Sequence, residues 1–181
     1  MEFLLYNFVE SVSVIHRVSM KTLKLLFVLV LIVGIGTTTK AQTTRSTKKA
    51  AKQAAIKKSI EGRNFTFDAN QATPLAGAPK TLTGTYDLHI KADSIISFLP
   101  YFGRAYFDVG YNETDMGIKF TSTKFDYQAV EKKNGSWIIT IKPGDVKNIE
   151  SLILLISVDG YASLTVTSTN RDVISYDGYL K

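Results

Sequence analysis

Cysteine is absent from this 181-residue chain, and histidine and tryptophan are rare, with two copies and one copy. The absence of cysteine excludes disulfide scaffolds, thiol nucleophiles, thiolate zinc sites and lipidation at an N-terminal cysteine. His89 is the only histidine beyond the first twenty residues, so we expect a surface imidazole rather than a Ser-His-Asp triad or a histidine zinc site. Phosphate loops and dinucleotide fingerprints are missing too. We therefore expect no catalytic residue, metal or cofactor. A carboxylate-type hydrolase stays open as an alternative, because it needs only two suitably spaced acids.

Long apolar runs are also lacking. The longest, Leu25–Val33, is preceded by two lysines and followed by glycines and small polar residues. It is too short for a membrane-spanning helix, but it has the charge, length and small-residue end of a secretory signal peptide. We interpret residues 20–41 as a signal peptide cleaved before Gln42, and residues 1–19 as an upstream extension from a misplaced start. The mature chain is expected in the periplasm or outside the cell, with no transmembrane anchor.

The positive charge is concentrated near the N-terminus. The formal net charge is +6, and four basic and two acidic residues precede Gln42, which leaves +4 for the mature chain. Between Gln42 and Ser59 there are six basic residues and no acidic one, so residues 59–181 carry a net charge of about −2. Because the basicity belongs to a tail, no nucleic-acid partner is expected. Residues 42–62 are predicted as a basic helical lead, with a helix from Ser46 to Glu61 closed by Gly62. It would either dock on an anionic envelope surface or be a solvated helix whose last turn packs on the sheet.

Residues 63–181 are predicted to form a single, mainly β domain, because apolar and polar side chains alternate along them. Turn signals lie at Ala92-Asp93, Lys133-Asn134-Gly135 and Asp159-Gly160. Sequential hairpins without crossover helices predict an antiparallel meander of about eight or nine strands, curled into a barrel-like sheet with one short N-terminal helix. A two-sheet β-sandwich is the alternative, since both bury one face of each strand. The expected strands are 64–69, 86–91, 94–99, 125–130, 137–141, 152–156, 161–168 and 173–180.

Residues 99–107 are dense in aromatic side chains and include one arginine. The aromatic rings offer faces for stacking, and the guanidinium offers a planar donor fork for an anionic or polar group. Alternatively, the aromatics cap the core while the arginine pairs with an acid. The adjoining acidic loop, 108–115, would complete the site. The predicted ligand-binding residues are Tyr101, Phe102, Arg104 and Tyr106.

A series of short motifs occurs in order along the chain. They are Asn64-Phe65-Thr66-Phe67, Leu99-Pro100-Tyr101-Phe102-Gly103-Arg104-Ala105, Gly117-Ile118-Lys119-Phe120, Trp137-Ile138-Ile139, Gly160-Tyr161-Ala162, Asn170-Arg171, and Ile174-Ser175-Tyr176 with Gly178. Over residues 46–180 the chain resembles the domain of unknown function 4251 family of exported Bacteroidota-type proteins. It departs from the pattern at Met116, where a glycine is expected. The resemblance implies a signal-bearing, single-domain envelope protein without an assigned activity, so it supplies no catalytic residue.

On these grounds we expect an exported envelope protein that binds a small molecule, glycan or peptide without catalysis. A structural or protein-interaction component of the envelope is the first alternative, docking through a sheet edge or the basic helix. The carboxylate-type hydrolase is the second, and it requires two acids facing one pocket. Whether the interior of the sheet is filled or open decides whether a ligand could bind inside it.

Overall fold

The computed structural model describes residues 39–107 and 117–181. Contacts divide the chain into two units, Met1–Lys48 and Lys49–Lys181, and the whole β-sheet belongs to the second. The predicted extension, the signal peptide up to residue 38 and the acidic loop 108–115 lie outside the described residues. Within the described ranges, no helix combines the length and the apolar character needed to cross a membrane.

The helix α3 (Thr39–Glu61) begins before the predicted Ser46, because no glycine or proline interrupts it. Its C-terminal end carries the two backbone hydrogen bonds of a Schellman motif. Arg63, with a φ of 48°, adopts the left-handed conformation there, rather than the predicted Gly62. This conformation is unfavourable for a residue with a Cβ. The contact of the Arg63 guanidinium with the Tyr127 ring, 4.9 Å from its centroid, offsets part of that cost.

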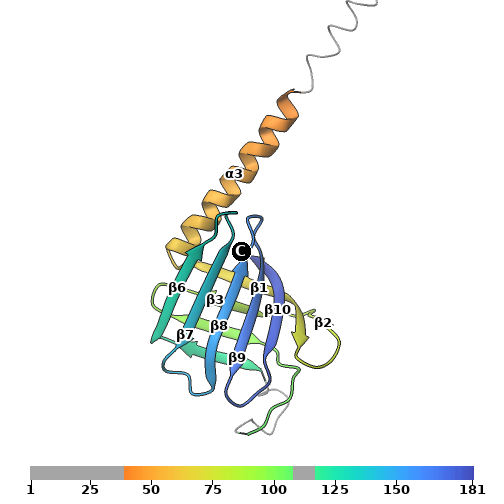
Figure 1. Ribbon diagram of the computed structural model, residues 1–181, viewed down its shortest axis with the longest axis vertical. Helices are drawn as coiled ribbons and strands as arrows, with labels where there is room; N and C mark the ends of the chain where they lie inside the picture. The colour runs from red at the N-terminus through yellow and green to blue at the C-terminus, as the bar shows by residue number, and fades with distance from the viewer. Residues whose placement is uncertain (1–38, 108–116) are drawn as a thin grey trace, which may run out of the picture. The chain divides into compact units, whose positions relative to one another are not determined.

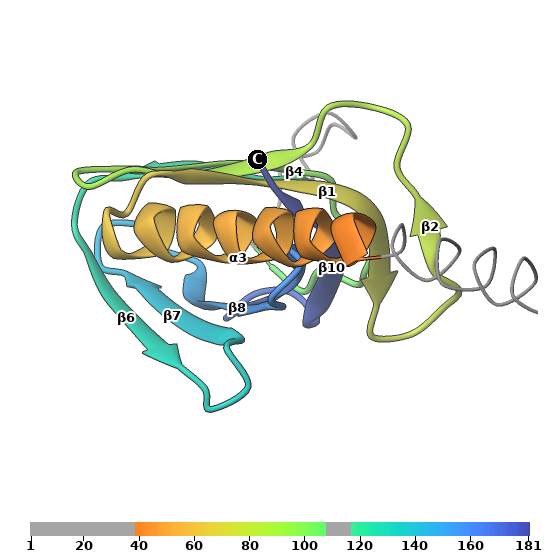
Figure 2. The same ribbon diagram turned by 90° about the horizontal axis from the view of Figure 1, so that it is seen from above.

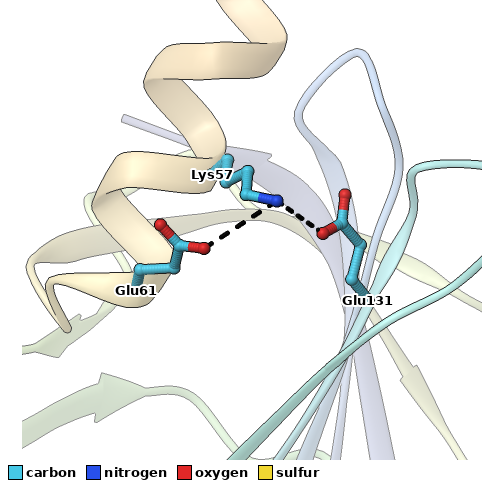
Figure 3. Close-up of polar contacts among 3 residues, drawn as sticks. All are labelled: Lys57, Glu61 and Glu131. Atoms are coloured by element: carbon cyan, nitrogen blue, oxygen red, sulfur yellow. Dashed lines mark hydrogen bonds and ion pairs between the residues drawn. The ribbon is translucent and has the colours of Figure 1, made fainter.

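The last turns of α3 pack on the sheet (Figure 3). Ile60 is fully buried in the core. The Nζ of Lys57 lies 2.8 Å from the Glu131 carboxylate, 3.9 Å from that of Glu61 and 5.8 Å from the centroid of the Trp137 ring. The hydrogen bond to Glu131 raises the pKa of Lys57, so Lys57 keeps its positive charge to more alkaline pH than a free lysine. The geometry is that of a solvated helix whose last turn is anchored, with the apolar contact contributing more than the exposed ion pairs.

The strands form one antiparallel sheet in the order β5-β4-β3-β1-β10-β9-β8-β7-β6, with β2 paired to β1 (Figure 1). The predicted mainly β, barrel-like antiparallel sheet with one N-terminal helix is confirmed. The described residues do not form a two-sheet sandwich, since all their named strands belong to the same sheet. The strands are β1 (Phe65–Pro74), β2 (Lys80–Thr81), β3 (Asp87–Ile90), β4 (Ile95–Leu99), β5 (Ile118–Ser122), β6 (Phe125–Glu131), β7 (Trp137–Pro143), β8 (Ile149–Ile156), β9 (Tyr161–Ser168) and β10 (Ile174–Leu180).

The long strand β1 curls the sheet. It pairs with β3 on one side and with β10 on the other, and its register against β10 shifts between Ala69 and Gln71. A bulge of this kind bends a strand and increases its twist. Figure 2 shows the result, with β1 and β4 along one side of the interior and β6, β7 and β8 along the other.

The interior of the curled sheet is filled by side chains. Inward positions alternate with outward ones along each strand; in β9, for example, Ala162, Leu164 and Val166 are buried. Each fully buried aliphatic side chain contributes about 1.5–3 kcal/mol relative to an exposed one. The interior is therefore occupied by the core, and the surfaces open to other molecules lie on the outside of the sheet. The largest fully buried side chains include Phe67, Leu88, Ile90, Ile139, Ile141, Leu152, Leu154 and Tyr176.

The two edge strands, β5 and β6, are joined by a tight turn that Asp145 holds from the β7–β8 connection. The Asp145 carboxylate accepts hydrogen bonds from the backbone N–H of Thr123 at 2.8 Å and of Lys124 at 3.1 Å, and a short one from the Ser122 hydroxyl. These donors, the Ser122 hydroxyl first, lower the pKa of Asp145 to about 2. The ionised carboxylate thus ties together the ends of the sheet.

Asp145→Asn is expected to destabilise the domain in a pH-dependent way. A lowered carboxyl pKa contributes stability above the unfolded-state value of 3.8, and this contribution disappears as pH falls through about 2. The wild type should therefore melt roughly 2–5 °C above the variant at neutral pH, and the two should converge near pH 2. Thermal unfolding followed by circular dichroism measures this. Asp126→Asn, at an exposed position on β6, is the control, and equal melting temperatures of all three proteins at neutral pH would contradict the assignment.

Candidate functional site

The predicted binding segment leaves β4 and runs against the connection between β9 and β10. An antiparallel bridge pairs Ala105 with Arg171. Beside this bridge, the backbone N–H of Tyr106 donates to the carbonyl of Asn170 at 2.9 Å. In the other direction, the backbone N–H of Asp172 donates to the carbonyl of Arg104 at 3.0 Å. The backbone of the loop is therefore held in place by its own hydrogen bonds before any ligand binds.

Tyr101 lies beneath this loop and is 9% exposed. Its hydroxyl lies 2.7 Å from the carbonyl oxygen of Arg104 and 3.0 Å from that of Asp172, and donates to both. Burial raises the pKa of Tyr101. A Cβ on Gly103 would be 2.4 Å from the hydroxyl, so only glycine fits there without displacing the ring. Tyr101 supports the loop from below, and the stacking predicted for it would require the ring to leave this position.

The other three predicted residues are exposed. Tyr106 is 64% exposed, and its hydroxyl makes a short hydrogen bond to the Asp172 carboxylate, which raises the pKa of Tyr106. Arg104 is exposed as well, and its backbone carbonyl accepts the hydrogen bond from the N–H of Asp172. Phe102 lies apart from this pair, with the Nζ of Lys80 4.7 Å from its ring centroid. The loop thus brings Arg104, Tyr106 and Asp172 together on its outer surface.

Sequence reasoning missed an apolar groove of about 580 Å³ on the outer face of β7 to β10. Its apolar lining includes Ile138, Leu155 and Tyr161, and Lys132 and Asp177 are among its charged residues. The sequence did contain a sign of this groove, which is the unbroken apolar run of β8. A strand that is apolar at consecutive positions places large apolar side chains on both faces of the sheet. Ile153 and Leu155 are the outward members of that run, and Leu155 is 51% exposed.

Two smaller cavities accompany the groove. One, of about 140 Å³, lies between α3 and the sheet, and the other, of about 170 Å³, lies beside β5. Glu131 is the one acid lining the first, Asp177 is the one acid lining the large groove, and the second small cavity has none. None of these three cavities presents the pair of carboxylates that a glycosidase needs. Over residues 39–107 and 117–181, no group of three metal-ligating side chains occurs.

His89 forms a chain with a hydroxyl and a carboxylate on the outer face of β1 and β3. Its Nδ1 is 2.8 Å from the Thr66 hydroxyl, and its Nε2 is 3.2 Å from the Asp87 carboxylate. The ring nitrogens are reversed relative to a catalytic triad, in which Nε2 faces the hydroxyl and Nδ1 faces the carboxylate. The N–H of Thr66 is also engaged, because it donates to the backbone carbonyl of Lys181 and is therefore not available to an oxyanion. We interpret this chain as a cross-strand contact that fixes the β1–β3 register.

Comparison with known proteins places this geometry in a family. The crystal structure of a DUF4251 family protein from Bacteroides eggerthii superposes with a TM-score of 0.53 and 16% identity, over 73% of this chain and 90% of that chain. This similarity establishes a shared fold. No curated protein sequence matches the chain. The family described as "Domain of unknown function (DUF4251)" matches residues 47–180, and the chain therefore belongs to the DUF4251 family.

Proposed function

We propose that this DUF4251 protein is an exported, non-enzymatic binding protein whose ligand-binding surface is the outer side of residues 102–107. The observation that supports it most is the exposure of the aromatic rings of Phe102, Tyr106 and Phe107 on a loop that also presents the Arg104 guanidinium. Binding residues are commonly held on loops of this kind, positioned by a rigid scaffold. The leader pattern before Gln42 supports a periplasmic or secreted location.

The chemistry of the loop favours a ligand with a flat apolar face and an anionic group. The Tyr106 ring is available to stack, while the Asp172 carboxylate holds its hydroxyl. A guanidinium binds a carboxylate through two parallel hydrogen bonds. An acidic sugar, as found in many glycans, combines a ring that can stack with such a carboxylate. On an open surface a single sugar would bind weakly, with a Kd on the order of 1 mM.

Arg104→Ala is expected to weaken binding of glucuronate, the probe that carries both a sugar ring and a carboxylate, to the level of glucose. In saturation-transfer NMR, the wild type should give a clear glucuronate signal and a signal at least about fivefold weaker for glucose, which lacks the carboxylate. The Arg104→Ala signal should fall to the glucose level, because the ion pair is lost while the ring contact remains. Arg104→Lys should retain part of the signal, since the charge stays and the donor fork is lost.

The control variant is Lys142→Ala, which removes an exposed cation from β7 and should bind like the wild type. Circular dichroism and melting temperature should be unchanged in the Arg104 variants. A loss of folding in Arg104→Ala would identify a structural arginine. Equal glucose and glucuronate signals, or equal binding by the wild type and Arg104→Ala, would refute the proposed role.

A further inference from the structure

The outer face of β6 to β8 carries a row of apolar side chains that water covers in the isolated domain. Val130, Ile138 and Leu155 are directly paired neighbours across these three strands. Val130 is 47% exposed and Leu155 is 51% exposed, and Tyr161 on β9 is 69% exposed. Contiguous exposed apolar residues with polar residues around them are a feature of protein contact surfaces.

The charges at this apolar row have opposite signs at its two ends. Lys132 follows β6, and Asp177 lies on β10, the strand at the other side of the groove. Four strand spacings separate β6 from β10 in the sheet order, which corresponds to about 19 Å. Leu155 lies on β8, midway between them. In the part of the chain that the structure describes, neither Lys132 nor Asp177 makes an ion pair.

We infer that this face is the contact surface between two copies of the chain, related by a two-fold axis close to Leu155. A two-fold interface is self-complementary, because the rotation places each end of the patch on the opposite end in the partner. Lys132 of each copy then faces Asp177 of the other, so two ion pairs flank a centre at which the two Leu155 side chains meet, while Ile138 of each copy lies over Ser163 of the other. A neutral ligand on the same face would leave both charges unmatched.

The size of the surface sets the strength of the dimer. A strip about 19 Å wide and about one strand, roughly 20 Å, long buries on the order of 400 Å² on each copy. This lies at the weak, reversible end of specific interfaces, so we expect a Kd of about 10–100 µM. The outward-facing polar residues of the neighbouring rows, such as Thr140 and Thr165, keep the monomer soluble below that concentration.

Charge reversal tests the inference by analytical ultracentrifugation of full-length protein from about 5 to 500 µM. The wild type should pass from monomer to dimer across this range. Lys132→Glu should stay monomeric, because it sets two pairs of acids against each other, and Asp177→Lys should stay monomeric because it opposes two pairs of lysines. An equimolar mixture of the two variants should dimerise like the wild type, because both contacts are then attractive.

Leu155→Asp removes the apolar centre and should be monomeric at every concentration, whereas Lys142→Ala should behave like the wild type. Melting temperatures measured near 5 µM, where all variants are monomers, should be unchanged. A wild type that stays monomeric at 500 µM would overturn the inference. So would dimers of Lys132→Glu or Asp177→Lys alone, or a mixture that fails to associate while the wild type does.

Discussion

Gly178→Ala is expected to destabilise the domain by about 3 kcal/mol or to prevent folding. Gly178 lies on β10 opposite Ala69, next to the bulge in β1. A Cβ at this position would be 1.9 Å from the carbonyl oxygen of Asp68, so the β1 backbone itself would have to move. Backbone in the centre of a ten-stranded sheet has no room to do so. Urea unfolding of the purified variant measures the loss.

Gly144→Ala is the matched control for this substitution. Its Cβ would be 3.4 Å from the carbonyl oxygen of Lys124, which is ordinary contact, and we expect a change below about 1 kcal/mol. If the two alanine variants were equally stable, the close approach of β10 to β1 at the bulge would be refuted, and with it the account of how the sheet curls.

Ile60→Ala is expected to cost about 3 kcal/mol, a decrease in melting temperature of roughly 10 °C. Ile60 is fully buried although it belongs to the exposed helix α3. Truncation would leave a cavity at the end of the sheet interior, where the Tyr127 hydroxyl donates to the Ile60 carbonyl at 3.1 Å. The variant should be measured near 5 µM, so that self-association does not contribute.

Two neighbouring substitutions calibrate the Ile60 result. Ile56, one turn earlier, is only partly buried, so Ile56→Ala should cost about 1 kcal/mol. Lys57→Ala removes an exposed ion pair and should leave the stability close to that of the wild type. Losses of similar size in all three variants would mean that the end of α3 is not part of the core, and that the sheet closes this end without the helix.

Most of the sheet could be predicted from the sequence, because local signals determine hairpins. Gly135 and Gly160 both have positive φ, at 79° and 83°, in the turns where the sequence placed them, and β9 occupies the predicted residues. The strand β5 was not predicted, because its alternation is weak and no glycine turn separates it from β6. The pairing of β1 with β10 was also out of reach, since it joins the two ends of the domain and depends on the bulge rather than on any local pattern.

The candidate site shows the same division between local and long-range information. The sequence indicated the exposed Arg104 and Tyr106, because their residue types are unusual in a loop. It did not indicate that Tyr101 is buried, since one of the two carbonyls that accept its hydrogen bond belongs to Asp172, 71 residues along the chain. The outer groove was missed because alternation assigns residues to the two faces of a strand but does not show which outward residues become neighbours.

The most direct test of the binding surface is an NMR titration of the ¹⁵N-labelled protein with glucuronate. The account predicts chemical-shift changes at the amides of residues 102–107 and 170–172, because these two segments form the loop and its support. The amides of the filled interior, such as those of Ile139 and Leu154, should not move. Shifts concentrated in the interior or around Leu155 in the groove, or no shifts at millimolar glucuronate, would contradict it.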